Sequence, residues 1–241
     1  MMYLVIDLEM GEVSPKDRES LGGIAKEIIQ IGAVLLNEAF SITREFNAYV
    51  RPRLGYVSRY VQKMTGITNG MLRHAPDIRE VLSEFVEWLP DEELVAMSWS
   101  DSDQRQLIAE MRVKEIFKEK IDALFPGWVD FQTDFGRMIG LRERCSLAEA
   151  LRISHVHPEG REHDGLCDAR NTALLLSKLM KSKKAKLLLT PIRSDHRNNA
   201  SSVKKSKWTF DRALFALRYG KEAALGDSYQ KHRFERCMHK Q

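Results

Sequence analysis

The longest largely apolar run of the chain, residues 27–36, is the feature that most constrains its fold. A run of this composition, rich in isoleucine, valine and leucine, predicts a β-strand. Residues 3–6 form a shorter apolar run before it, and residues 42–50 alternate well enough to form a third strand after it. Because the connections are short, we predict an antiparallel meander at the start of a sheet.

The middle of the chain changes its apolar spacing to that of helices. Helices are predicted at residues 57–64, 78–89, 104–113, 147–153 and 163–179, with a further helical region beginning near residue 131 and a strand at residues 94–98. Asp77 and Ser146 are expected to cap two of these helices, and Glu149 stands at the capping-box position. A meander followed by alternating helices and strands predicts a mixed-sheet α/β domain with helices on both faces.

The composition is that of a soluble globular protein. The 241 residues are 43% hydrophobic and 30% charged, enough for one α/β domain of roughly 180 residues with an appendage, or for two small domains. No apolar run approaches the roughly 20 residues that span a bilayer, and no signal-peptide pattern precedes Tyr3. Cys145, Cys167 and Cys237 have no metal-binding spacing. We therefore expect reduced thiols in a cytoplasmic protein without a membrane partner.

The charge is distributed unevenly. Residues 181–241 carry 16 Lys and Arg against 5 Asp and Glu, whereas residues 1–180 carry 22 against 29. A basic tail on an acidic body predicts a polyanionic partner for the tail, or else a solubilising terminus. Within the tail, residues 194–207 are predicted to be a linker or disordered. Residues 208–219 are predicted to form an aromatic amphipathic helix that docks on the body, on a second copy or on nucleic acid.

Two carboxylates follow the first apolar run. In a strand, alternate side chains share a face, so Asp7 and Glu9 would point the same way. Burying two neighbouring carboxylates is unfavourable unless cations compensate their charge. The pattern therefore indicates either a divalent metal site at the end of a strand or a solvated strand end.

Further polar groups occur where a metal site in an α/β fold would need them. Asp101 and Asp103 follow the strand at residues 94–98, at the end where ligands gather in such folds. His163 and Asp168 lie five residues apart, which places the histidine on the incoming loop and the aspartate in the first turn of the helix. Carboxylates suit Mg²⁺ or Mn²⁺, and a histidine beside them suits a general base. Together these groups describe two-metal phosphodiester hydrolysis.

The order and spacing of these residues resemble the DEDDh exonucleases of ribonuclease-H-like fold. The resemblance covers residues 2–180. It rests on residues 7–9, 98–103 and 163–173 for the three acidic motifs, with further similarity at residues 27–33, 64–68 and 146–151. The resemblance implies a mixed five-stranded sheet with helices on both faces in an exonuclease domain at residues 1–180. Residues 181–241 would form a basic C-terminal extension.

The resemblance also implies an activity, namely 3′→5′ removal of nucleoside 5′-monophosphates from single-stranded ends. Trp99 and residues 65–68 look most like the exoribonucleases that trim histone-mRNA and small-RNA 3′ ends, which favours RNA over DNA as the partner. Two alternatives stay open. One is a proofreading-type DNA exonuclease that acts with a polymerase, and the other is a nuclease-dead module that binds nucleic acid or protein.

By the same resemblance, the site would hold two Mg²⁺ or Mn²⁺ ions. The expected ligands are Asp7, Glu9, Asp103 and Asp168, and the expected base is His163. Asp7 would bridge both ions, and Glu9 would also help to position the attacking water. Asp101 competes with Asp103 for the ligand role, and we choose Asp103 because similar family members carry an Asp-x-Asp whose second aspartate is catalytic.

Six residues are expected to contact substrate: Met10, Met64, Thr65, Ile67, Trp99 and His163. Met10 departs from the family pattern, which has a small or hydroxyl residue there, so its contact with the terminal nucleotide is expected to differ. Trp99 would stack on a base or belong to the core, and Met64 and Ile67 would flank the scissile nucleotide or simply pack. His155 and His157 together with His163 offer a possible zinc site, but a His-x-His pair beside a proline is more typical of a loop.

Overall fold

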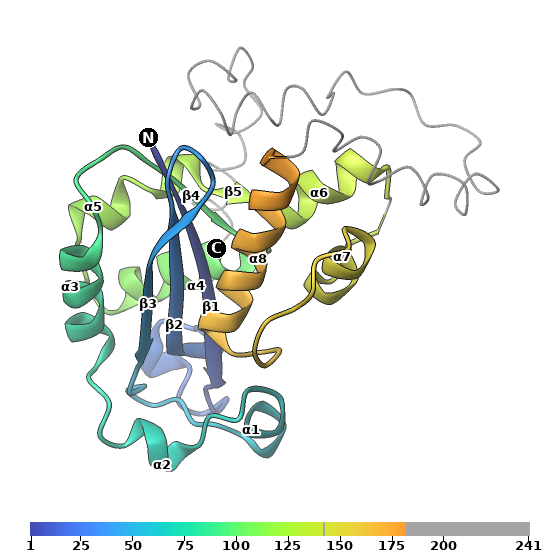
Figure 1. Ribbon diagram of the computed structural model, residues 1–241. Coiled ribbons are helices and arrows are strands. Elements are labelled where there is room, and N and C mark those ends of the chain that lie inside the picture. The colour runs from blue at the N-terminus through green and yellow to red at the C-terminus, as the bar shows by residue number, and fades with distance from the viewer. Residues whose placement is uncertain (142, 182–241) are drawn as a thin grey trace, which may run out of the picture.

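The computed structural model describes residues 1–141 and 143–181, which form a five-stranded sheet between two layers of helices (Figure 1). The strands are β1 (Met2–Glu12), β2 (Lys26–Leu36), β3 (Ile42–Tyr49), β4 (Leu94–Ser98) and β5 (Val129–Asp130). Their order is β3-β2-β1-β4-β5, with β1, β2 and β3 antiparallel and with β4 parallel to β1 and β5. The predicted meander and mixed five-stranded sheet are confirmed.

Two strands differ from the sequence-based expectation. β1 continues through Asp7 and Glu9 because β2 stays paired with it as far as Glu12 opposite Lys26. The two carboxylates therefore lie inside the strand, and the prediction that they follow its end was wrong. β5 has only two residues, which is too short for an alternating pattern to reveal.

The helices cover both faces of the sheet, as predicted. They are α1 (Arg59–Thr65), α2 (Asn69–Leu72), α3 (Ile78–Trp88), α4 (Asp101–Val113), α5 (Glu119–Asp122), α6 (Phe131–Ile139), α7 (Leu147–Ile153) and α8 (Gly165–Lys181), with 3₁₀ turns at Glu19–Leu21 and Phe125–Gly127. Alternation along β1 produces two cores. Tyr3 and Val5 pack with residues of α6, α7 and α8, whereas Leu4 and Ile6 pack with residues of α3 and α4.

Side-chain caps fix where two of the predicted helices begin. Asp77 forms a full capping box with Glu80 at the start of α3, as its position predicts. The Ser146 hydroxyl accepts a hydrogen bond from the backbone N–H of Glu149 at the start of α7, which confirms its predicted role. The Glu149 carboxylate pairs with Arg152 on the exposed side of α7. The expected capping-box contact of Glu149 is therefore replaced by an ion pair.

Three helices begin later or earlier than predicted. α4 begins at Asp101 instead of residue 104, because Ser100 caps it by accepting the N–H of Ser102. α8 begins at Gly165, and α1 at Arg59, each two residues later than predicted. These shifts leave the region before α8 as a loop, which matters for the site described below.

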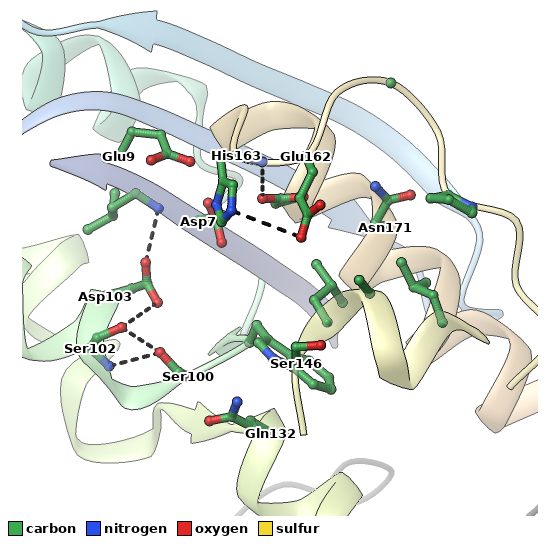
Figure 2. Close-up of a pocket in the computed structure, with 18 of the residues that line it drawn as sticks. Asp7, Glu9, Ser100, Ser102, Asp103, Gln132, Ser146, Glu162, His163 and Asn171 are labelled. Carbon is green, nitrogen blue, oxygen red and sulfur yellow. Dashed lines mark hydrogen bonds and ion pairs between the residues drawn. The ribbon is translucent and has the colours of Figure 1, made fainter. Parts of the chain in front are cut away.

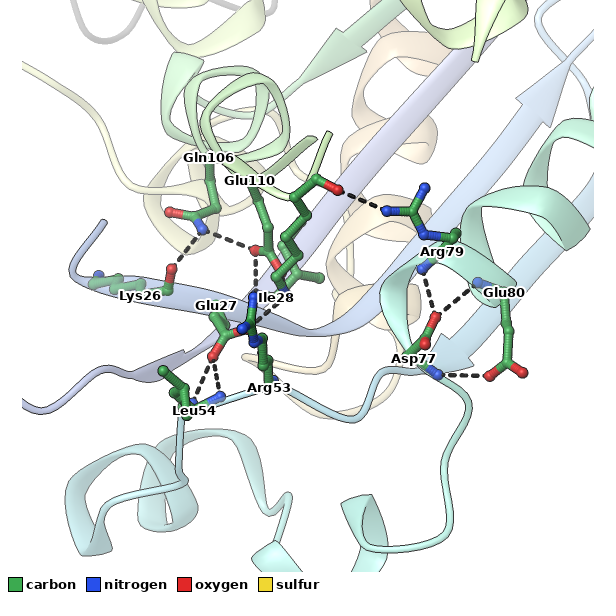
Figure 3. Close-up of polar contacts among 12 residues, drawn as sticks. Lys26, Glu27, Ile28, Arg53, Leu54, Asp77, Arg79, Glu80, Gln106 and Glu110 are labelled. Carbon is green, nitrogen blue, oxygen red and sulfur yellow. Dashed lines mark hydrogen bonds and ion pairs between the residues drawn. The ribbon is translucent and has the colours of Figure 1, made fainter. Parts of the chain in front are cut away.

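A buried ionic network joins α4 to the start of β2 (Figure 3). Lys114 contacts both Glu27 and Glu110, and the side chains of these two glutamates have no exposed area. Glu27 also accepts hydrogen bonds from the backbone N–H groups of residues 53–55. Glu110 accepts one from Ile28, next to the point where the β1–β2 register shifts. The network therefore holds α4 against the irregular part of the sheet.

Some expectations concern parts of the chain beyond these elements. Among the described residues, no helix has the length and apolar character needed to cross a membrane. Cys145 and Cys167 are free. Apart from Lys181, the basic extension at residues 181–241 lies outside the described residues, together with its linker, its aromatic helix and Cys237. The two-part organisation of the chain stays a prediction.

Candidate active site

The central strand presents two carboxylates to one layer of helices. Asp7 and Glu9 lie on the same face of β1 as Tyr3 and Val5, which pack in the core that α8 shares. Glu9 is only 7% exposed. The pairing residues on β2 are Gly32 opposite Asp7 and Gln30 opposite Glu9.

A close approach of α8 to β2 brings Asp168 to this face. A Cβ atom at Gly32 would lie 2.1 Å from the backbone carbonyl carbon of Gly165, so only glycine fits at residue 32. Gln30 Oε1 accepts a hydrogen bond from the Gly165 N–H at 3.0 Å. The first turn of α8, which carries Asp168, is therefore fixed directly against the strand that pairs with β1.

His163 lies in the loop before α8, as predicted from its distance to Asp168. Its φ of 61° is left-handed, a conformation that costs a residue with a side chain about 1 kcal/mol or more. The His163 backbone N–H donates to Asp168 Oδ2 at 2.9 Å, which helps to hold this conformation. The imidazole is 46% exposed, so it is accessible to water and ligands.

Asp103 reaches the site because the strands diverge. β4 pairs with β1 only along Met2–Val5, which leaves the Leu8 N–H without a partner from β4. Asp103 Oδ1 accepts this N–H at 3.0 Å, and the Asp103 side chain is 5% exposed. The first turn of α4 is thereby tied to the middle of β1, between the two carboxylates of that strand.

The choice between Asp101 and Asp103 has a geometric answer. Asp101 Oδ1 accepts hydrogen bonds from Arg105 at 3.0 Å and from Arg144 at 3.4 Å. Asp103 lines the same pocket as Asp7 and Glu9. The structure therefore brings Asp103 to the other carboxylates, while Asp101 is engaged by two arginines.

These groups surround a pocket of about 540 Å³, within the usual range for ligand sites (Figure 2). Seven of the residues predicted for the site line it: Asp7, Glu9, Met10, Trp99, Asp103, His163 and Asp168. Glu9, His163 and Asp168 each offer one potential ligand atom, and these atoms lie within 4.8 Å of one another. Three segments far apart in the sequence therefore converge on one volume.

The residues predicted from the loop after α1 are placed differently. Met64, Thr65 and Ile67 are absent from the described lining of the pocket. The Thr65 hydroxyl donates to the Val61 carbonyl and accepts the Ile67 N–H, and Ile67 is 1% exposed. Both side chains thus help to end α1 and to build a small core. Of the two roles expected for Ile67, the structure shows packing.

Trp99 belongs to the core, which is one of its two expected roles. It is 8% exposed and packs edge-on against Phe131, with ring centroids 5.8 Å apart, and against Phe135. It also lines the pocket. A core tryptophan thus forms part of the pocket wall.

Four of the carboxylates that line the pocket, those of Asp7, Glu9, Asp103 and Asp168, have raised pKa values. Burial is the largest cause for each, and the neighbouring carboxylates add to it for Asp7 and Glu9. The pKa rises to about 8 for Glu9, about 7 for Asp103 and about 6 for Asp168, and it lies well above the usual range for Asp7. The charged forms of these groups are thus disfavoured in the protein alone.

The donor set fits divalent cations. None of the ion pairs between described residues joins a Lys or Arg to the four pocket carboxylates. Oxygen donors that repel one another are stabilised by a hard cation such as Mg²⁺ or Mn²⁺. His155 and His157 do not belong to the metal-competent cluster found among the described residues, so the structure does not support the zinc alternative.

Several residues that shape the site carry no role in the sequence-based prediction. Gln30 and Gly32 position α8, and both lie in the segment 27–33 that contributes to the family resemblance. Glu162 lines the pocket, with its Oε1 4.0 Å from His163 Nε2. Arg144 also lines it, from a region without a recognisable motif. The segment 27–33 was the available signal for the first two.

Comparisons with known proteins agree with this geometry. A family model described as exonuclease matches residues 4–176. The ERI1 exoribonuclease 2 of Danio rerio is 31% identical over 200 residues, covering 73% of this chain and 34% of that protein. The 3′-5′ exoribonuclease 1 of Mus musculus is 27% identical over 166 residues, covering 64% of this chain and 47% of that protein. The chain spans about a third to a half of these two relatives.

The solved nuclease domain of 3′hExo, described as a DEDDh family member bound to rAMP, has the same fold. It matches with a TM-score of 0.64 at 21% identity, covering 76% of this chain and 94% of that one. The family match includes all three segments that form the pocket. The predicted family is thus confirmed, and the chain belongs to the exonuclease family.

Proposed function

We propose that this chain is a metal-dependent 3′→5′ exonuclease. Its substrates are the 3′ ends of single-stranded nucleic acid, with RNA favoured, and its products are nucleoside 5′-monophosphates. One observation carries the proposal, namely that four carboxylates, three of them buried, and a half-exposed histidine from three distant segments line one pocket. The family match and the exoribonuclease relatives support the same reaction and favour RNA.

Asp7, Glu9, Asp103 and Asp168 would hold two Mg²⁺ or Mn²⁺ ions. When bound, the ions supply a nucleophile at neutral pH and neutralise charge on the phosphate in the in-line transition state. Asp103 and Asp168 each have one oxygen engaged by a backbone N–H, from Leu8 and His163 respectively. These hydrogen bonds orient the carboxylates before any ligand arrives.

His163 would accept the proton of the attacking water. Its backbone is tied to Asp168, so the base and one carboxylate move as a unit. Its exposure lets the proton pass to solvent after the step. Met10 and Trp99 on the pocket lining would contact the terminal nucleotide.

The test uses the full chain with 5′-labelled and 3′-labelled single-stranded RNA and DNA in Mg²⁺, Mn²⁺ or EDTA. We expect stepwise shortening from the 3′ end with either ion, none in EDTA, and faster cleavage of RNA. Asp103→Asn should remove activity. Asp101→Asn, two residues earlier in the same turn of α4, should keep most of it. Absence of shortening in every condition would favour a binding module, and a strong preference for DNA would favour the proofreading alternative.

A further inference from the structure

The segment between β3 and α3 has an unusual charge pattern. Residues 51–76 contain five cationic residues and no Asp or Glu, although residues 1–180 as a whole are acidic. All five are exposed: Arg51, Arg53, Arg59, Lys63 and Arg73. None of the ion pairs between described residues involves them. An exposed positive region therefore lies on an otherwise acidic body.

Exposed aromatic side chains occur in the same segment. Tyr60 on α1 is 70% exposed and Tyr56 is 43% exposed, beside Arg59 and Lys63. We call the side chains of Arg53, Tyr56, Arg59, Tyr60 and Lys63 the α1 surface. Cations interleaved with exposed aromatic rings suit single-stranded nucleic acid, because cations contact phosphates and rings stack on bases.

The α1 surface begins at the edge of the pocket. Tyr56 pairs through its backbone N–H and carbonyl with Glu12, two residues beyond the pocket residue Met10. Arg161, between the pocket residues Gly160 and Glu162, donates to the carbonyls of Lys63 and Met64. In Figure 1, α1 lies at the end of the sheet where β1 finishes and α8 begins.

The pocket itself is a poor attractor of polyanions. Five carboxylates line it, and Arg144, the only Lys or Arg among its described lining residues, is engaged by Asp101. A negatively charged strand therefore needs a source of attraction outside the pocket. The α1 surface is a cationic region that adjoins it.

We propose that the α1 surface binds the upstream nucleotides of a single strand whose 3′ end occupies the pocket. This inference rests on the proposed function and adds a second binding region to it. Nucleic acid is favoured over an acidic protein because the surface combines exposed rings with cations and is continuous with the pocket. Arg59 and Lys63 contact phosphates, and Tyr60 stacks on a base.

The experiment measures binding of a fluorescently labelled 15-nucleotide RNA to the full chain in EDTA, over a range of salt concentrations. Arg59→Glu/Lys63→Glu should weaken binding roughly tenfold and make the slope of log affinity against log salt shallower by about 1.4. Tyr60→Ala should weaken binding about fivefold or more without changing that slope. The matched control, Lys120→Glu/Arg137→Glu, makes the same charge change on α5 and α6, at the opposite end of the sheet from α1 (Figure 1).

Three results would overturn the proposal. They are binding by the α1 double variant equal to wild type, an equal loss in the control variant, and competition by polyglutamate as effective as by unlabelled RNA. A dinucleotide substrate in Mn²⁺ supplies a further arm, since it fills only the pocket and its cleavage should stay within about twofold in the α1 variants. If wild type cleaves nothing, the proposed function fails while the binding comparison still decides the role of the α1 surface.

Discussion

Helix α4 contributes a carboxylate to each of two buried groups that behave in opposite ways. Glu110, near its end, shares Lys114 with Glu27, and Asp103, near its start, lines the pocket with other carboxylates. Burial alone would raise the pKa of Glu27, but hydrogen bonds from Lys114 and from the backbone of residues 53 and 54 outweigh it, so this pKa is lowered. Asp103 keeps a raised pKa of about 7 despite its own hydrogen bonds.

This difference in pKa distinguishes a structural group, Glu27 and Glu110 with Lys114, from a functional one, the carboxylates of the pocket. A buried carboxylate that is paired with lysine and backbone N–H groups is satisfied by the protein itself. Glu110 is intermediate, since burial raises its pKa and Lys114 offsets only part of the effect. The pocket carboxylates depend on something from outside, and divalent cations meet that need. Burial of carboxylates alone would not have told the two groups apart.

The largest expected effect is that of the substitution Asp7→Asn in the pocket. We expect loss of exonuclease activity by at least about 10³-fold, because charge stabilisation worth several kcal/mol is removed from the transition state. The free energy of unfolding in EDTA should stay the same or rise, since one repelling charge is gone. The checks are cleavage assays and urea unfolding of the same samples.

The control for this variant is Glu110→Ala, which alters the other group. It leaves the Ile28 N–H without its partner and removes one of the two glutamates that pair with Lys114, so stability should fall while activity is largely kept. If Asp7→Asn lost stability and Glu110→Ala lost activity, the assignment of the two groups would be reversed.

The second prediction concerns Lys114→Met. Removing the shared cation leaves Glu27 and Glu110 buried together, which should lower the free energy of unfolding by about 3–5 kcal/mol. Urea unfolding at pH 7 measures this, with Lys120→Met on the exposed α5 as the control. Adding Glu110→Gln to Lys114→Met should restore part of the loss, and a double variant as unstable as the single one would contradict the charge argument.

The last prediction concerns the dependence of stability on pH. Glu9, Asp103 and Asp168 have pKa values of about 8, 7 and 6 in the folded protein, against ordinary values near 4. The folded state therefore binds more protons than the unfolded state between pH 4 and 8. The free energy of unfolding in EDTA should therefore fall as pH rises through this window.

Thermal unfolding at several pH values checks this, and Mn²⁺ should raise the Tm more at pH 8 than at pH 5. Asp103→Asn should reduce the fall in the free energy of unfolding at the alkaline end of this pH window. The lowered pKa of Glu27 acts with the opposite sign, since its contribution is lost as the pH falls below its ordinary range. Stability in EDTA that rises from pH 5 to 8 would mean that the pocket carboxylates do not repel one another as described.

Most of the fold was predictable because it follows from local patterns. A long apolar run marked β2 and alternation marked β3. Helical spacing marked α3 and α7, and Asp77 and Ser146 marked where those two helices begin. β5 was missed because two residues carry no period. The early start of α4 was missed because the Ser100 cap stands one residue before a polar first turn without apolar spacing.

The types of residue in the site were predictable from the sequence, but which of the predicted residues line the pocket was not. Sequence spacing suggested Asp7 and Glu9 on one face and indicated His163, Asp168 and one of Asp101 and Asp103 as further members of the site. The family resemblance favoured Asp103. Nothing in the pattern indicated that Met64 and Thr65 would lie away from the pocket lining. Their positions depend on how α1 ends at Gly66, whose φ is 77°, and on hydrogen bonds within that turn.

By itself, the sequence determined the sheet order of its first three strands, the two-sided helical cover and the chemical character of the site. The tertiary structure decided which aspartate of the Asp-x-Asp pair enters the pocket, because Asp103 takes the Leu8 N–H that β4 leaves unpaired. It also decided how close α8 lies, because Gly32 admits the backbone of Gly165. Both outcomes depend on backbone groups that need a partner or a space, and neither requirement is visible in side-chain periodicity.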